Sequence, residues 1–257
     1  MQEWTDEDLA RLPVRDGVRQ RGQAPTRLET FCDASFAFAV TILVISGGVP
    51  ASYAELIKAL KDAPAFAASF AAIAAFWSAH RQWGQRYGLE DRPAVLLSLA
   101  MVFGMLVYVY PLKMVFQALA AWASGGALPA TFTIRTLTEL RGLFVIYGLG
   151  FAAQATMMAL LYAHTLRVPS LRLDAAERLR TRHKVESWVV MLATGITSAL
   201  WAGFMPDPLG AFAGFVYSAL AVVMPVLATR QERRVRESET TRDERHLREE
   251  VSADRVT

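Results

Sequence analysis

Six apolar stretches, each bounded by polar residues, follow one another along the chain. They cover residues 31–49, 64–80, 94–122, 143–166, 185–205 and 209–229. A helix needs about 20 mostly apolar residues to cross the hydrocarbon core of a bilayer, and the second stretch is the shortest of the six. We count it as a span because it is rich in alanine and has polar flanks. The pattern therefore predicts an all-α, polytopic membrane protein with six transmembrane helices per subunit.

Charged residues are concentrated outside these stretches. The 28 residues from Arg230 onward hold eight arginines and eight carboxylates, whereas residues 93–166 hold four charged side chains. If all six stretches span, 22 Arg and Lys residues lie on the side of both termini and 5 lie on the other side. Because cytoplasmic loops are enriched in Arg and Lys, we expect both termini in the cytoplasm. The expected organisation is a cytoplasmic segment at 1–26, a membrane domain at 27–229 and a charged cytoplasmic tail at 230–257.

The composition excludes several classes of protein. With 53% hydrophobic and 20% charged residues, the chain is neither an ordinary soluble enzyme nor a nucleic-acid reader, and lipid is its expected surrounding. The single cysteine, Cys32, excludes an intramolecular disulfide and any multi-cysteine metal site. Sequence signatures of hydrolases, zinc proteases and P-loop proteins are missing, so we expect no enzyme, no metal site and no cofactor. Gly148 and Gly150 resemble a dinucleotide fingerprint, but their position inside a span indicates close helix packing.

The first stretch carries an ionisable residue near its start. Asp33 lies two residues into the span, where a charge is costly unless it is paired or faces water. It is therefore a candidate functional residue. The alternative is a helix-start carboxylate near the membrane interface that is favoured by the helix dipole.

A stripe of apolar residues with one hydroxyl runs along the same helix. At 3.6 residues per turn, Ala34, Phe38, Thr41 and Ile45 share one face, and Ile42 lies beside it. Such a face suits a narrow pore wall with one polar ring. The alternative, commoner among membrane helices, is a packed helix face on which the Thr41 hydroxyl bonds its own backbone four residues back.

The second stretch ends with aromatic and titratable residues. Trp77 and His80 occupy its expected cytoplasmic end, which is also where Asp33 begins the first span. His80 could therefore pair with Asp33. The alternative is an interfacial aromatic belt with a solvated histidine.

Taken together, these segments resemble the transmembrane protein 175 family of potassium channels. The family signature R-x-x-x-F-S-D is similar to Arg27-Leu-Glu-Thr-Phe31-Cys32-Asp33 here, with cysteine in place of serine. The segment from Pro64 to His80 matches the family's second helix, and Tyr108-Val-Tyr-Pro111 matches its proline-terminated third helix. The resemblance covers residues 27–112 by motif and 143–229 by the number of spans.

The resemblance implies that four six-helix subunits surround a central pore lined by the first helix. It implies an apolar constriction at Phe38, further apolar rings at Ile42 and Ile45, and a hydroxyl ring at Thr41. Phe38 stands where the family has isoleucine, and Ser98 stands where many relatives have asparagine. The residues implied to hold the pore-lining helix in place are Arg27, Phe31, Asp33, Trp77 and His80.

We expect a homotetrameric channel in a bacterial cytoplasmic (inner) membrane that conducts potassium ions passively and binds no nucleic acid. One alternative is a proton-coupled secondary transporter that uses Asp33 and His80 as titrating partners. Another is a non-conducting membrane scaffold or sensor that acts through the tail.

Overall fold

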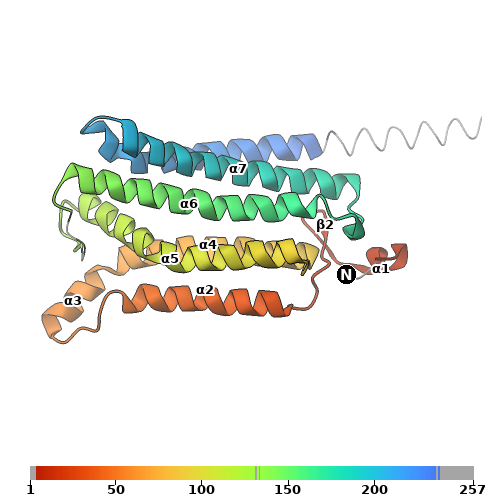
Figure 1. The fold of residues 1–257 in the computed structure, drawn as a ribbon, viewed down its shortest axis with the longest axis horizontal. Coiled ribbons are helices and arrows are strands. Elements are labelled where there is room, and N and C mark those ends of the chain that lie inside the picture. The colour runs from red at the N-terminus through yellow and green to blue at the C-terminus, as the bar shows by residue number, and fades with distance from the viewer. Residues whose placement is uncertain (1–3, 131, 133, 236, 238–257) are drawn as a thin grey trace, which may run out of the picture.

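The computed structural model describes residues 4–130, 132, 134–235 and 237, and all six predicted spans are helices in it. Five are the α-helices α2 (Arg27–Ile45), α4 (Ala63–Tyr87), α5 (Arg92–Ala123), α6 (Leu137–Thr165) and α7 (Ala175–Phe204). The sixth covers Leu209–Val235 and begins as the 3-10 helix η2 (Leu209–Ala219). The long helices run side by side (Figure 1). The prediction of an all-α protein with six membrane-spanning helices is confirmed, and the short second stretch is part of a 25-residue helix.

The ends of these helices coincide with residues that favour helix starts and stops. Thr26 and Glu29 form a capping box at the start of α2, in which each side chain accepts a hydrogen bond from the backbone of the other. Asp174 and Glu177 do the same at the start of α7. Helix α4 ends at Gly88, whose φ of 57° lies in the left-handed region that glycine adopts without strain. These residues satisfy backbone groups that a helix end leaves unpaired.

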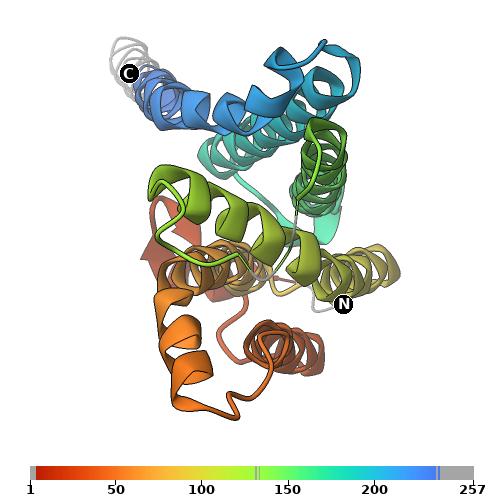
Figure 2. The ribbon, with the colours of Figure 1, turned by 90° about the vertical axis from the view of Figure 1, so that its left-hand side faces the viewer.

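Helix α2 lies at one edge of the bundle. It packs against α4 and α5, while α6 and α7 form the most extensive helix pair and the last span packs on α7. Viewed along the helix axes, α2 occupies the lower edge of the molecule and the last span the upper edge (Figure 2). Only part of the surface of α2 is therefore covered within this chain.

Two glycines allow the backbones of α6 and α7 to come into contact. A Cβ atom on Gly148 would lie 2.7 Å from the carbonyl oxygen of Gly195, and one on Gly195 would lie 2.8 Å from the carbonyl oxygen of Gly148. Both distances are shorter than side chains tolerate. Close helix packing at Gly148, as predicted, is confirmed.

Short elements outside the spans are not predicted by the apolar pattern. The N-terminal segment contains α1 (Asp6–Arg11) and a hairpin of β1 (Val14–Arg15) and β2 (Val18–Arg19). Asp16 and Gly17 form the hairpin turn with positive φ, and Asp-Gly was the one signal in the sequence for it. Helix α3 (Tyr53–Lys61) joins α2 to α4, and η1 (Pro169–Leu171) precedes α7.

The predicted tail, 230–257, begins as a continuation of the last span. The helix reaches Val235, and beyond it the tail lies outside the described residues except for Glu237.

The contact between α6 and α7 generates the first prediction. Gly148→Ala forces the two backbones apart, so we expect it to destabilise the protein by about 1–3 kcal/mol. The midpoint of thermal unfolding of the purified protein in detergent measures this change. Gly142→Ala is the matched control, because a Cβ atom there meets nothing within 4 Å on the same helix. The control should be neutral or stabilising, since alanine favours helix over glycine; equal losses for both variants would contradict the prediction.

Candidate ion pathway

One face of α2 is closed by the rest of the chain. Cys32, Phe36, Ala39 and Leu43 are buried there and belong to the core formed with α4 and α5. Their spacing of three or four residues is that of a single helix face. The packing therefore determines which side of α2 points away from the bundle.

The opposite face of α2 carries the predicted apolar stripe. Phe38 is 59% exposed and Ile45 is 69% exposed, and Thr41 is exposed between them. Ile42 lies at the border of this face, where it is half-buried and packs against the core. The structure thus brings three of the four predicted constriction residues to one exposed face and places the fourth at its edge.

The Thr41 hydroxyl makes a local hydrogen bond. It donates to the carbonyl oxygen of Ala37 at 3.1 Å, the backbone contact that the packed-face alternative expects. Within this chain the face is exposed, so Thr41 is not buried against another described helix of the same chain. A hydroxyl that donates its proton still has lone pairs to accept with, so its oxygen can face a cation.

Asp33 is paired, but with a different residue from the one the sequence suggests. The indole N–H of Trp77 donates to its carboxylate at 2.7 Å, and the Arg81 guanidinium lies 5.4 Å from the centre of the same indole ring. The imidazole of His80 is buried, and its Nε2 lies 2.9 Å from the hydroxyl oxygen of Ser98. The expected pairing of Asp33 with His80 is therefore wrong.

The two alternatives for His80 both fail for the same reason. The imidazole ring is neither solvated nor bonded to Asp33. The ring centroids of Phe36 and Trp83 lie 6.5 and 5.8 Å from its own centroid, and its Nε2 is hydrogen-bonded to the Ser98 hydroxyl. The transporter hypothesis needs Asp33 and His80 as titrating partners, and it gains no support from this arrangement.

Arg27 and Phe31 lie on the exposed side of α2. Both line a shallow hollow of about 440 Å³ at the start of this helix, to which Glu90 and Leu99 also contribute. Arg27 precedes Ala34 by seven residues, so it shares the face of the apolar stripe. In a single chain these two motif residues face outward, whereas Asp33 bonds a neighbouring helix.

A lysine that sequence reasoning did not select holds the other end of α2. The Lys113 ammonium on α5 donates to the Ser46 hydroxyl at 3.0 Å and to the carbonyl oxygen of Leu43 at 3.4 Å. The Asp62 carboxylate lies 4.0 Å from it and accepts from the Gln117 amide at 2.8 Å. A cation at a helix C-terminus complements the helix dipole. The available signal was a lysine inside a long apolar stretch, which marks a paired or functional residue.

Comparisons with known proteins agree with the arrangement around α2. A family model described as the endosomal/lysosomal potassium channel TMEM175 matches residues 27–111, the part of the chain that holds α2, α4 and most of α5. A protein of Marivirga tractuosa named "Potassium channel" is 31% identical over 227 residues, which cover 84% of this chain and 92% of the relative. The chain belongs to the TMEM175 potassium channel family.

The match to a TMEM175 structure extends beyond the motif. A crystal structure of a variant of the potassium channel MtTMEM175, in complex with a nanobody–MBP fusion protein, has a TM-score of 0.75 and 30% sequence identity to the chain. The alignment covers 86% of this chain and all of that one. The chain is accordingly a multi-pass membrane protein of a channel family, and channels are not enzymes. Among the described residues, no cluster of three or more His, Cys, Asp or Glu side chains is placed to hold a metal ion.

The Lys113 contacts generate the second prediction. Lys113→Met removes the cation from the end of α2 and leaves the partly buried Asp62 carboxylate without it, so we expect a loss of about 1–3 kcal/mol of stability. Thermal unfolding in detergent measures it. Lys58→Met, at an exposed lysine on α3, should change stability by less than about 0.5 kcal/mol. A Lys113→Met protein as stable as the wild type would show that α2 does not depend on this contact.

Proposed function

We propose that four copies of this chain form a potassium-permeable channel in which the α2 helices line a central pore. The observation that carries the proposal is the exposed stripe of Phe38, Thr41 and Ile45 on the helix at the edge of the bundle. This helix is the first element of the region that the TMEM175 family model matches, and its opposite face packs against the rest of the chain. From here on we call α2 the pore helix.

Conduction is passive in this proposal. Phe38 side chains from four subunits meet at the axis and form an apolar constriction that resists the entry of hydrated ions. One turn further, four Thr41 hydroxyl oxygens offer acceptors that partly replace the hydration shell of potassium. Ile42 and Ile45 continue the apolar wall. The permeating potassium ion is the only ligand that the mechanism requires.

The motif residues position the pore helix. The Asp33 carboxylate accepts a hydrogen bond from Trp77 of α4, and His80 of α4 packs beside Phe36 of the pore helix. These two contacts with α4 orient the cytoplasmic half of the pore helix. Arg27 and Phe31 face away from the bundle, where a second subunit of a tetramer would lie. We place the channel in a bacterial cytoplasmic membrane with both termini in the cytoplasm, which the 22-to-5 distribution of Arg and Lys supports.

Potassium flux through liposomes tests the constriction. Phe38→Ala widens the apolar ring, and we expect about tenfold higher flux, which corresponds to about 1.4 kcal/mol of barrier. Phe204→Ala is the matched control, because Phe204 is 80% exposed on α7, away from the pore helix. Wild-type protein that conducts no potassium above empty vesicles, together with a Phe38→Ala variant that conducts none either, would refute the channel.

The Thr41 ring has its own test. Thr41→Val keeps the shape of the side chain and removes the oxygen, so we expect potassium flux to fall by about fivefold, or about 1 kcal/mol. The comparison is made at equal protein-to-lipid ratio, with Thr156→Val as the control on α6, where the hydroxyl bonds the Ala152 carbonyl in the same local manner. Equal flux from wild type and Thr41→Val would remove Thr41 from the pathway. Fourfold particle symmetry in detergent checks the oligomer.

A further inference from the structure

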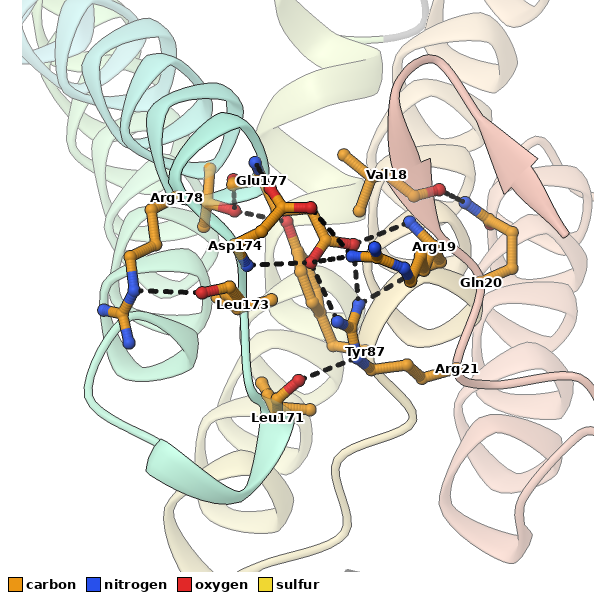
Figure 3. A network of polar contacts seen from close by, with 11 residues as sticks. Val18, Arg19, Gln20, Arg21, Tyr87, Leu171, Leu173, Asp174, Glu177 and Arg178 are labelled. Atoms are coloured by element: carbon orange, nitrogen blue, oxygen red, sulfur yellow. Dashed lines mark hydrogen bonds and ion pairs between the residues drawn. The ribbon is translucent and has the colours of Figure 1, made fainter. Parts of the chain in front are cut away.

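The segment that follows the N-terminal hairpin of β1 and β2 is fastened to the start of α7 by a buried ion pair (Figure 3). The Arg21 guanidinium meets the Glu177 carboxylate through two parallel hydrogen bonds, Nη1 to Oε1 at 3.0 Å and Nη2 to Oε2 at 2.9 Å. The Arg21 side chain is 0% exposed and that of Glu177 is 2% exposed. Its Nε donates to the carbonyl oxygen of Leu171 at 3.0 Å. All three nitrogens of the Arg21 guanidinium therefore donate hydrogen bonds. Arg21 and Glu177 lie 156 positions apart in the sequence.

A second arginine reinforces the same contact at its edge. The backbone N–H of Arg19 donates to Glu177 Oε1 at 2.8 Å, and its guanidinium lies 2.8 Å from the Asp174 carboxylate. Asp174 precedes α7, and partial burial raises its pKa. Hydrogen bonds from the backbone N–H of Glu177 and from Arg19 lower it further than burial raises it, so the pKa of Asp174 lies below its ordinary value. The Asp174 carboxylate therefore stays ionised opposite Arg19 at neutral pH.

The same segment is fastened to the end of α4. The backbone N–H groups of Arg21 and Gly22 donate to the carbonyl oxygens of Arg86 and Gln85 at 3.2 and 3.0 Å. A Cβ atom on Gly22 would lie 2.4 Å from the carbonyl oxygen of Gly84, so glycine is needed for this approach. The segment is thus held between α4 and α7 immediately before the pore helix.

The connection from this contact to the pore helix is short. Four residues, Gln23 to Thr26, separate Gly22 from the first residue of the pore helix, and Thr26 caps that helix through its side chain. The five Cα–Cα steps from Gly22 to Arg27 span at most about 18 Å when fully extended. The first turn of the pore helix therefore cannot move far while Arg21 stays in place.

We propose that Arg21 and Glu177 are positioning residues for the pore helix. Arg21 lies in the segment between the N-terminal hairpin and that helix, so its ion pair with Glu177 tethers the cytoplasmic end of the helix to α7, while the backbone of the same segment is bonded to α4. This inference rests on the proposed function of α2. It adds a regulation of the pore by a part of the chain that lies outside the family-matched region, 27–111. A buried ion pair is weak evidence for stability, because apolar residues of equal volume often serve as well. A bidentate pair instead gives a defined position to the segment that leads into the pore helix.

The chain contains its own reporter for the position of the pore helix. Cys32 is its single cysteine, lies one turn into the pore helix and is 0% exposed against α4 and α5. A maleimide reagent labels it only when the start of the helix leaves its neighbours. The test compares full-length Arg21→Gln, Glu177→Gln, the double variant and Arg21→Lys in liposomes. Arg172→Gln is the matched control, because Arg172 is exposed and its side chain contacts the N-terminal segment at the same end of the molecule, at Asp6 (2.8 Å) and at the Trp4 carbonyl oxygen (2.9 Å).

We expect each single variant to lower potassium flux by about fivefold and to label Cys32 about tenfold faster, which is the size of effect that coupled positions give. The double variant should match either single variant, because both act through one contact. Arg21→Lys, which retains the charge but loses the second hydrogen bond, should fall between. Arg172→Gln should stay within about twofold of wild type in both measurements.

Two outcomes overturn the proposal. In the first, Arg21→Gln lowers the unfolding temperature but leaves flux and Cys32 labelling equal to those of Arg172→Gln, so the pair only stabilises the fold. In the second, the effects of the two single variants add in the double variant, so they do not act through each other. If neither the wild-type protein nor Phe38→Ala conducts potassium, the proposed channel fails instead, and Cys32 labelling still decides whether the pair holds α2.

Discussion

One face of α2 is closed by packing against α4 and α5, and this constraint determines what the other face can do. Burial of Cys32, Phe36, Ala39 and Leu43 sets the rotation of the helix about its axis. With that rotation, the stripe that includes Phe38 can only point away from the bundle. The rest of the structure maintains the packing: α6 packs against α5 and α4, α7 packs against α6, and polar contacts hold α2 near its two ends.

The polar contacts lie at the helix ends for a physical reason. In the middle of the bilayer an unpaired charge is costly, whereas near the interface it can be paired at lower cost. Asp33 with Trp77 at one end, and Lys113 with Ser46 at the other, follow this rule. Between them α2 needs no polar contact to a neighbouring helix, because its backbone is satisfied internally. A helix held at its ends and packed along one side can present an uninterrupted apolar face on the other.

The candidate site was only partly predictable. The stripe on α2 follows from helical periodicity, which is a local property of consecutive residues. The partner of Asp33 was not predictable, because Trp77 and His80 lie three residues apart on α4 and both carry a ring N–H at the same membrane depth. The tertiary packing decides between them: it turns His80 into the core toward Ser98 and leaves Trp77 beside the carboxylate. The contact of Lys113 with the end of α2 depends in the same way on the relative height of two helices.

The sequence alone determined the number of spans and their order along the chain. Each of these follows from the length and composition of a continuous stretch, since a bilayer requires about 20 apolar residues whatever their neighbours are. Only the tertiary structure decided which face of α2 is covered, which donor Asp33 accepts from, and that Arg21 and Glu177 meet across 156 residues. Those outcomes depend on the rotation of each helix about its own axis and on its shift along that axis relative to its neighbours. Charge counting treats Arg21 as one of many cytoplasmic arginines, whereas the fold buries it against a carboxylate.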